Sequence, residues 1–412
     1  MIELTSEQRD VQQWAREFAA RFVAPRALEL DKNPESPARD ELIREAARAG
    51  LFGNSLPEFL GGQGHDPLTG VLVTEELAAA CSGCAVLFGA TMLGLSPILM
   101  SGDLEKIQRF VKPLAESWET DKPRLAALGA TEPGLGSDFI QGHPEGRGRT
   151  RVERKGDGYL ISGRKVFISN GSLASLVTVF ATHDPEATIR ESTSCFAVPT
   201  DTPGFAVGQV FDKMGQRACP AAELLLDDVF VPEDHLIGKE CEGWELNRRI
   251  MSVTRTPVAA IALGIARAAY DRALDYAAER VQGGKPIVRH QAIQLLLADM
   301  SIRVEAARGL VWKAAASTAA GQPSLKLASM AKTFASDAAV ANASDAIQVL
   351  GGNGYMHEYG VEKLLRDAKL TQIYEGTNQI NRFEIMEAVM EEIGNGSHAQ
   401  ISSFQKSKKL NH

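Results

Sequence analysis

Apolar residues near the start of the chain recur at the spacing of a helix. Five of them follow at three- and four-residue spacing and share one face: Val11, Trp14, Ala15, Phe18 and Phe22. Just before them, Thr5 and Gln8 have the spacing of a capping box, which satisfies free backbone groups of a first helical turn. The pattern therefore predicts a helix that starts after Thr5 and buries one stripe of side chains.

A turn-rich break at Pro57 and residues 61–64 separates this helix-rich segment from a second one. Residues 69–81 are again helical in pattern, and an uncharged run over residues 82–101 follows, interrupted by Pro97. Glycine and proline interrupt this run too often for a membrane span, so we interpret it as a pair of buried helices. Residues 1–124 are predicted to form an N-terminal helical domain.

Between residues 125 and 240 the pattern changes to short runs rich in β-branched and aromatic residues, separated by glycine and proline. The runs cover residues 151–154, 159–162, 165–168, 176–182, 194–198, 205–210 and 224–231. This spacing predicts a compact central β-barrel or sandwich domain.

Helical periodicity returns from residue 241 to residue 393. Four long segments carry it: 257–281, 289–319, 325–350 and 377–393. Long helices with short connections are typical of an antiparallel four-helix bundle, so the predicted fold class is α+β. Residues 394–412 are polar and basic without periodicity, and we expect a flexible tail there.

Composition excludes several classes of protein. With 412 residues, 44% hydrophobic content and a formal charge of −8, the chain has the composition of a soluble protein of two or three domains. The acidic balance argues against nucleic acid as a partner, because phosphate binding needs clustered positive charge. The one basic stretch, residues 147–155, we interpret as a solvated strand face rather than a phosphate site. We expect no membrane partner.

The cysteines predict thiols rather than a disulfide framework. Their number, five, is odd, and they are scattered over the chain. Cys81 and Cys84 form a C-x-x-C pair, but no second pair follows at zinc-ribbon spacing, so we interpret them as helix-packed thiols and expect no metal site. The amino terminus has no secretion or transit pattern, which favours a cytoplasmic location.

Four segments have residues suited to chemistry. They are residues 128–138, 165–171, 348–355 and 372–380. Taken singly, each has an ordinary explanation: a glycine-rich turn, an apolar strand end, a helix stop at Gly351 and Gly352, and a lone solvated carboxylate at Glu375. Taken together and in this order, the four segments closely resemble the acyl-CoA dehydrogenase family, and the resemblance runs from Leu4 to about Met390.

The resemblance is closest to the short- and medium-chain type with Tyr374-Glu375-Gly376-Thr377. It implies an FAD-dependent α,β-dehydrogenation of an acyl-CoA thioester to the trans-2-enoyl-CoA, with electrons passed to an electron-transfer flavoprotein. Glu375 matches the base that removes the α-proton, and its backbone N–H would polarise the thioester carbonyl. The β-hydrogen would leave as hydride to flavin N5. The substrate contacts implied are Ser137, Thr254, Arg255, Tyr374 and Gly376.

The same resemblance assigns two groups of residues to FAD. The ring group would contact the isoalloxazine and consists of Leu128, Ala130, Thr131, Gly136, Ser137, Phe167 and Ser169. The second group would bind the pyrophosphate and adenosine and consists of Arg280, Gln291, Gln348, Gly351, Gly352, Thr377 and Gln379. In relatives this second group lies partly across a subunit boundary, which implies a homo-oligomer, with a tetramer expected.

The chain departs from the family pattern at a few positions. Phe167 and Ser169 replace the more usual Trp and Thr, Gly283 stands where an aromatic is usual, and Ser252 stands where some relatives have a carboxylate that recognises CoA. A base must also be desolvated, and Ile373 and Tyr374 are expected to surround Glu375. Residues 86–100 contain no Arg or Lys to hold a second carboxylate, which disfavours a glutaryl-type substrate.

Three other functions remain open. A carrier protein could replace CoA, which Ser252 favours slightly. The same fold also occurs in flavin monooxygenases and oxidases that lack this base, and it could serve a non-catalytic flavoprotein scaffold. The intact motif around Glu375 argues against the last two.

Overall fold

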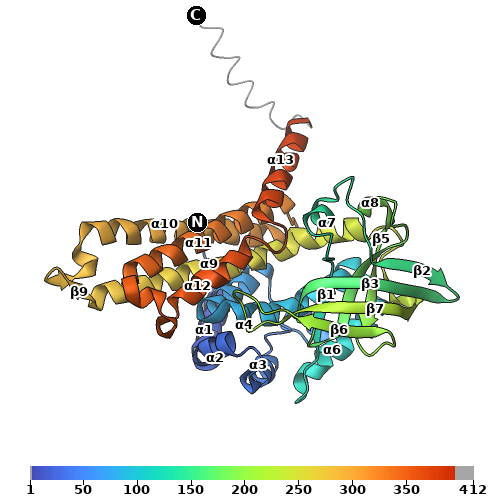
Figure 1. The fold of residues 1–412 in the computed structure, drawn as a ribbon, viewed down its shortest axis with the longest axis horizontal. Helices are drawn as coiled ribbons and strands as arrows, with labels where there is room; N and C mark the ends of the chain where they lie inside the picture. Colours follow the sequence, from blue (N-terminus) through green and yellow to red (C-terminus); the bar gives the residue numbers. More distant parts are fainter. Residues whose placement is uncertain (1, 395–412) are drawn as a thin grey trace, which may run out of the picture.

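The chain begins with a group of helices, drawn in blue in Figure 1. The structure is a computed structural model, and it describes residues 2–394. The first helices are α1 (Ser6–Phe18), α2 (Ala27–Lys32) and α3 (Pro37–Arg48). The predicted capping box is present, because the Thr5 hydroxyl accepts from the Gln8 backbone N–H at 3.1 Å. Ala15 and Phe18 of the predicted stripe are buried.

Helix α4 (Pro67–Ser101) covers the predicted helical stretch 69–81 and the uncharged run 82–101, but this run forms one buried helix, so the predicted division at Pro97 is wrong. The backbone leaves helical geometry at Cys81 (φ −160°, ψ 108°), which divides the element in two, whereas Pro97 lies inside the second half without ending it. By length and composition α4 and α9 (Gly243–Glu279) could each cross a membrane, yet 72% and 67% of their apolar windows are buried inside the protein. Such burial is typical of core helices. Short helices α5 (Leu104–Lys106) and α6 (Lys112–Glu116) lead on to the sheet.

The predicted barrel or sandwich takes the form of one eight-stranded mixed sheet, green in Figure 1. Its strands are β1 (Leu125–Gly129), β2 (Arg151–Lys155), β3 (Gly158–Ser169), β4 (Ala174–Thr182), β5 (Thr193–Pro199), β6 (Phe205–Val210), β7 (Ala221–Pro232) and β8 (Leu236–Ile237). They are ordered β6-β7-β3-β2-β4-β5-β8, and β1 pairs in parallel with β4. Helices α7 (Ser137–Gln141) and α8 (Ile189–Ser192) lie in the connections.

The sheet differs from the prediction in detail. Residues 159–162 and 165–168, expected as two strands, are parts of β3, which shifts register against β7 beside Gly163 (φ 154°). Strand β1 was not expected because Leu125-Ala126-Ala127-Leu128-Gly129 lacks β-branched residues, and tertiary pairing with β4 determines its conformation. In β2 only Val152 is buried, so its basic residues form a solvated face, as predicted.

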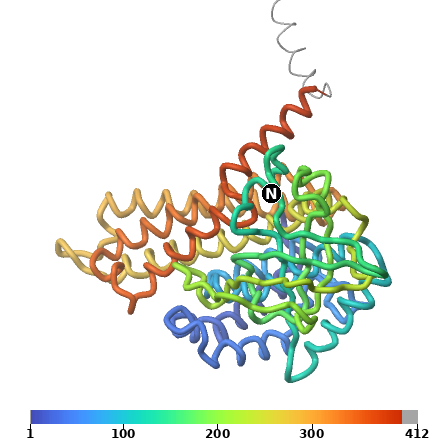
Figure 2. The backbone as a smooth tube through the Cα atoms, turned by 45° about the vertical axis from the view of Figure 1, so that its right-hand side comes forward, coloured from blue at the N-terminus to red at the C-terminus, as the bar shows by residue number. Residues whose placement is uncertain are grey.

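The C-terminal helices are α9, α10 (Gln291–Ala319), α11 (Leu325–Leu350), α12 (Val361–Thr371) and α13 (Asn378–Gly394). Helices α9, α10 and α11 pack together, α12 packs on α9 and α11, and α13 contacts α11 and α7. Figures 1 and 2 show α13 projecting away from the bundle. A hairpin of β9 (Val281–Gln282) and β10 (Lys285–Pro286) joins α9 to α10.

Two features of the bundle differ from the expected helices. Helix α9 begins at Gly243 rather than at Pro257, because Trp244, Ile250 and Met251 are buried and stabilise the turns before the exposed proline. Helix α12 was not expected, although its buried residues Val361, Leu364 and Ala368 have helical spacing. Gly394 is the last residue of α13, and the rest of the expected tail, residues 395–412, lies outside the described residues.

The three regions share one hydrophobic core through α4, and a second cluster lies within the sheet. Two glycines permit close packing at α4. A Cβ on Gly94 would lie 2.5 Å from the Ala127 backbone nitrogen of β1, and a Cβ on Gly264 of α9 would lie 2.6 Å from the Glu75 carbonyl oxygen. All five cysteines are free thiols, and Cys81 and Cys84 are buried, as predicted.

Candidate active site

The predicted base lies in a strained loop between α12 and α13, which we call the base loop (residues 372–377). Glu375 has φ 54° and Gly376 has φ 84°, two successive left-handed conformations. A non-glycine residue in this region costs of order 1–3 kcal/mol, so surrounding contacts must hold it there. Such strain is concentrated at functional sites.

Helix α9 supplies two of those contacts. The Thr254 hydroxyl donates to Glu375 Oε2 at 2.8 Å, and Arg255 Nε donates to the Glu375 carbonyl oxygen at 2.9 Å. Arg255 is fully buried, and its guanidinium also binds Glu384 of α13 and, at 2.8 Å, Ser329 of α11. The structure thus places Arg255 beneath the base loop, and a direct contact between Arg255 and substrate stays a prediction.

Helices α11 and α13 hold the next carbonyl of the base loop. The Gly376 oxygen accepts from Lys332 Nζ at 2.7 Å and from Asn381 Nδ2 at 2.8 Å. Lys332 and Asn381 are both fully buried. Neither residue was predicted from the sequence, because a single lysine or asparagine inside a helix carries no motif.

Desolvation raises the pKa of Glu375 above its usual 4.5, while the Thr254 hydrogen bond and the positive charges of Arg255 and Lys332 act in the opposite direction. The expected desolvating role of Ile373 is wrong, since this side chain is 50% exposed. Tyr374 does pack against the core, and its hydroxyl lies 3.4 Å from Gln216 Nε2. A raised pKa makes the carboxylate a stronger base, as α-proton removal requires.

The glycine-rich loop (residues 129–137) is fixed from below by a buried ion pair. Lys165 Nζ lies 2.8 Å from Glu132 Oε1 and donates to the Ala130 carbonyl at 3.1 Å. Glu132 also accepts the backbone N–H groups of Arg149 and Thr150, at 2.7 and 3.1 Å. Both charged side chains are almost fully buried, and sequence reasoning gave neither a role.

The ring group of predicted FAD contacts lies at the end of β1, on this loop and at the end of β3. Phe167 is 64% exposed with φ 61°, and it packs against Phe211 at a ring-centroid distance of 4.9 Å. The Val166 N–H binds the Thr131 carbonyl at 2.9 Å, which joins the strand to the loop. A Cβ on Gly134 or Gly136 would meet nothing within 4 Å. An open glycine loop beside an exposed aromatic fits a flat ring.

The rest of the ring group is accessible as well. Leu128, Ala130, Thr131, Ser137 and Ser169 are partly exposed. Ser137 begins α7, and a Cβ on Gly376 would come within 3.3 Å of Ile140 Cγ2 of that helix. The loop, α7 and Glu375 therefore form one site, and Thr377 and Gln379 lie beside it at the start of α13.

The other predicted FAD contacts lie at the opposite end of the bundle. Arg280, Gln291, Gln348, Gly351 and Gly352 are all exposed there, and we call them the open end. Asn353 beside them donates to the Tyr276 hydroxyl at 2.9 Å, which joins the ends of α11 and α9. From Arg255 to Arg280, α9 rises about 37 Å at 1.5 Å per residue. One chain does not bring the open end to Glu375.

The two remaining departures from the family pattern have local explanations. Gly283 and Gly284 have φ 60° and 77°, which is the two-residue hairpin turn that requires left-handed residues between β9 and β10. The Ser252 hydroxyl donates to the Arg249 carbonyl of its own helix at 2.7 Å. Both residues therefore have structural roles.

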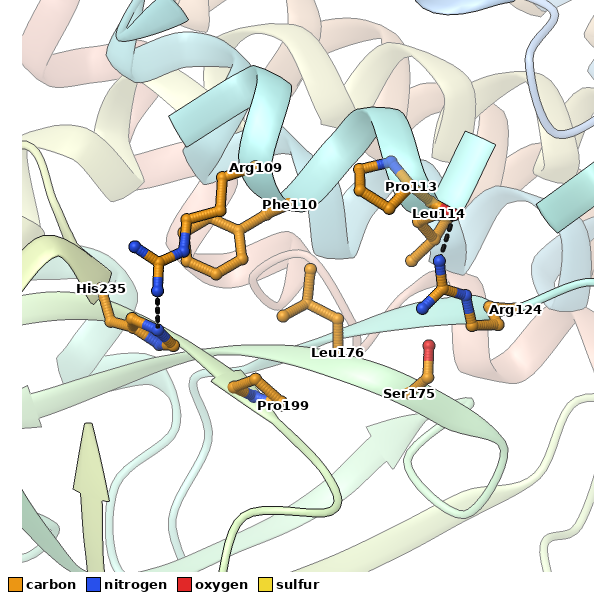
Figure 3. Close-up of a pocket in the computed structure, with 9 residues that line it drawn as sticks. All are labelled: Arg109, Phe110, Pro113, Leu114, Arg124, Ser175, Leu176, Pro199 and His235. Carbon is orange, nitrogen blue, oxygen red and sulfur yellow. Dashed lines mark hydrogen bonds between the residues drawn. The ribbon is translucent and has the colours of Figure 1, made fainter. Parts of the chain in front are cut away.

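A separate cavity of about 260 Å³ lies between α6 and the sheet. Figure 3 shows its lining, with Arg109, Arg124 and His235 around an apolar floor. Arg109 binds Asp234 and His235, and Arg124 binds the Pro113 carbonyl. The cavity shares no residue with the site around Glu375, and both of its arginines already have hydrogen-bond partners. Among residues 2–394 no group of three His, Cys, Asp or Glu side chains is arranged to hold a metal.

Fold and site together define an enzyme in which one desolvated carboxylate works beside a loop suited to a flat cofactor ring. Comparison with known proteins gives the same result. Family models described as acyl-CoA dehydrogenase, N-terminal, middle and C-terminal domain match residues 5–117, 127–229 and 241–390. The chain belongs to the acyl-CoA dehydrogenase family. It is therefore an oxidoreductase of a family of FAD-dependent flavoproteins, and FAD is its cofactor.

Individual relatives match along nearly the whole chain. Cyclohex-1-ene-1-carbonyl-CoA dehydrogenase of Syntrophus aciditrophicus (strain SB) is 41% identical over 93% of this chain and 89% of its own. Butyryl-CoA dehydrogenase from Megasphaera elsdenii is similar in structure, with a TM-score of 0.88, 37% identity and coverage of 95% and 100%.

A third similar chain comes from a structure described as "Electron transferring flavoprotein of Acidaminococcus fermentans: Towards a mechanism of flavin-based electron bifurcation". Its TM-score is also 0.88, with 38% identity and coverage of 94% of this chain and 99% of that one. The family assignment therefore holds across all three regions of the fold.

Proposed function

We propose that the protein dehydrogenates an acyl-CoA thioester between its α and β carbons to give the trans-2-enoyl-CoA, with Glu375 as the base. The observation that carries this proposal is the Glu375 carboxylate, which is desolvated, held by Thr254 and set in a loop beside the ring group. The relatives named for CoA substrates support the thioester class.

Glu375 would take the α-proton on a carboxylate oxygen while Thr254 keeps the other oxygen in place. No described residue accepts the backbone N–H of Glu375, so this group is free to bind the thioester carbonyl and stabilise negative charge as the α-proton leaves. Arg255 holds the carbonyl of the same residue and thereby fixes the peptide that follows the side chain. When bound, FAD supplies the acceptor for the β-hydrogen, taken as hydride at N5.

The substrate we propose carries a short, medium, branched or cyclic acyl group. The second half of α4 contains no Arg or Lys between residues 86 and 100, which leaves a second carboxylate without a partner there. Two relatives named for butyryl and cyclohexene-carbonyl substrates support this range. As electron acceptor we propose an electron-transfer flavoprotein, in line with the similar chain from Acidaminococcus fermentans.

We further propose a homo-oligomer, with a tetramer expected. Helix α13 projects from the bundle with exposed apolar side chains, Phe383, Met386, Met390 and Ile393. A second copy that covers such a surface would remove apolar area from water. The open end lies far from Glu375 of its own chain, so it completes an FAD site only if it comes from a neighbouring copy.

A panel of acyl-CoA thioesters tests this function. Purified protein with bound FAD is mixed anaerobically with each thioester, and the loss of flavin absorbance is followed. We expect at least one short, branched or cyclic acyl-CoA to bleach the flavin and to yield the enoyl-CoA.

Three other results would favour the alternatives. Bleaching only by carrier-protein thioesters would replace CoA with a carrier. Rapid hydrogen peroxide formation in air would identify an oxidase. A flavin left oxidised by every thioester would contradict the proposal.

A further inference from the structure

Lys332 lies fully buried under the base loop, on the side of α11 that faces α13. Its Nζ donates to the Gly376 carbonyl at 2.7 Å and to Asn378 Oδ1 at 2.9 Å. These two acceptors are the residue directly after Glu375 and the first residue of α13. Lys332 therefore spans the end of the base loop from below.

Lys332 can make its two hydrogen bonds in either protonation state. An ammonium group carries three N–H donors, whereas a neutral amine carries two, and the described contacts of Nζ are two. Burial and the nearby charge of Arg255 lower the pKa of Lys332 to about 7. Both hydrogen bonds go to the base loop or to the start of α13, and the Lys332 side chain is shielded from solvent.

Arg255 and Lys332 each hold the carbonyl of one of the two strained residues. Arg255 Nε binds the carbonyl of Glu375, and Lys332 Nζ binds the carbonyl of Gly376. These carbonyls follow the two left-handed conformations, φ 54° and 84°. Without Lys332, Asn381 Nδ2 would be the one described side chain that still donates to the Gly376 carbonyl, at 2.8 Å. The Gly376 peptide would then be held less firmly, and the Glu375 carboxylate would shift with it.

We propose that Lys332 is a positioning residue of the active site, which holds the Gly376 carbonyl and thereby sets the direction of the Glu375 carboxylate and N–H. This inference rests on the proposed function, and it adds Lys332 to Arg255 as a residue that holds the base loop in place. Lys332 does not contact the reacting atoms, and it acts through the backbone of the base loop.

The charges around Lys332 connect its state to that of the base. Arg255 of α9, Glu375 of the base loop, Asp337 of α11 and Arg382 of α13 face it, and Glu384 of α13 pairs with Arg255. A positive charge on Lys332 favours ionised Glu375. Removing this charge should therefore raise the pKa of Glu375 and move the pH profile of flavin reduction to higher pH.

Two variants separate the hydrogen bond from the charge. Lys332→Met removes both, whereas Lys332→Gln keeps two N–H donors without charge. Lys326→Met on the same helix is the control, because Lys326 binds Glu392 on the surface and touches neither carbonyl. Each variant is prepared as the full chain with FAD.

Amide hydrogen exchange of the peptide over residues 372–378, read by mass spectrometry, tests the positioning without substrate. We expect faster exchange in Lys332→Met, wild-type exchange in Lys326→Met, and an intermediate value in Lys332→Gln. Wild-type exchange in both Lys332 variants would overturn the proposal, and this holds even if no thioester reduces the wild-type flavin.

Stopped-flow reduction by the best acyl-CoA supplies the second readout. In Lys332→Met the limiting rate should fall about 10- to 100-fold, the cost of a displaced catalytic group, while acyl-CoA affinity changes by less than about twofold. The pH midpoint should rise in both Lys332 variants. If Lys332→Met does not fold, the test uses the pH midpoint and the reduction rate of Lys332→Gln. Wild-type values of both in Lys332→Gln would contradict the positioning role of Lys332.

Discussion

The two ends of the C-terminal bundle contrast in how their polar groups are satisfied. At the Glu375 end, buried side chains hold successive carbonyls of the base loop, and Glu132 with Lys165 holds the glycine-rich loop. At the open end, Arg280, Gln348 and Gly351 face solvent. Both ends match the same family pattern for FAD, but one chain completes only the first.

This difference indicates which part of the site is preorganised within the subunit. A base must have its direction and its pKa fixed before substrate arrives, and internal hydrogen bonds supply both. Groups that bind the distant parts of a cofactor can be supplied by another copy, since they need only the right surface. Mutations at the Glu375 end, which we call the closed end, should therefore change stability and chemistry. Mutations at the open end should change cofactor retention.

The largest expected effect is loss of the ion pair under the glycine-rich loop. Lys165→Met leaves Glu132 charged and buried without its partner, which costs about 3–5 kcal/mol of unfolding free energy. Lys155→Met on the exposed strand β2 should change stability by about 0.5 kcal/mol or less. Denaturant unfolding of both variants measures this difference. Equal midpoints would show that the ion pair does not stabilise the closed end.

Arg280→Ala at the open end should weaken FAD binding about 10- to 100-fold, the value of a charge-assisted hydrogen bond worth about 1.5–3 kcal/mol. The Arg280→Ala chain should still fold and keep Glu375 in place. Arg289→Ala, an exposed neighbour, is the matched control. FAD titration of the stripped proteins gives both constants. Unchanged affinity in Arg280→Ala would mean that the open end does not serve the cofactor.

Gly376→Ala should slow flavin reduction by about tenfold. An alanine at φ 84° costs about 1–2 kcal/mol, and its Cβ would lie 3.0 Å from Arg255 Nη2. Gly309→Ala, in open space on α10, should leave the rate unchanged. Stopped-flow reduction compares the two, and a wild-type rate in Gly376→Ala would show that the strained conformation is not needed.

The smallest effect is on the pH dependence of stability, to which two carboxyl groups of the closed end contribute with opposite sign. Desolvation raises the pKa of Glu375, so its ionised, active form should appear only above the usual 4.5, and its contribution to stability is lost as pH rises through that pKa.

Lys165 lowers the pKa of Glu132, so its contribution to stability is present above 4.5 and is lost as pH falls through the lowered pKa. Reduction rates and unfolding midpoints over a pH series should therefore separate the two carboxyls. A reduction rate that falls with rising pH around the midpoint would contradict the role of Glu375.

Sequence patterns predicted much of the fold because they report local chemistry. The capping box at Thr5 and the stripe around Phe18 depend on neighbours in sequence, and the structure has both. Helix α9 starts at Gly243 rather than at the expected Pro257, because the buried Trp244 stabilises the turns before the proline. Strand β1 was missed because its pairing with β4 cannot be read from its own residues.

The candidate site could be predicted only where a motif carries it. Glu375 and Phe167 were found through recognisable segments, and the structure gives both left-handed backbones. Lys332, Lys165 and Glu132 were given no role, because their importance lies in what they touch across the fold. Glycine is needed at position 283 because of the hairpin turn there, which the sequence alone did not predict.

The most direct test of the central claim is anaerobic reduction of the flavin by an acyl-CoA in wild type, in Glu375→Gln and in the exposed control Glu387→Gln. Glutamine keeps the shape of the side chain but cannot take the α-proton. The account predicts that Glu375→Gln retains FAD and is reduced about 10²- to 10⁴-fold more slowly, whereas Glu387→Gln matches wild type. Reduction of Glu375→Gln at the wild-type rate would contradict it.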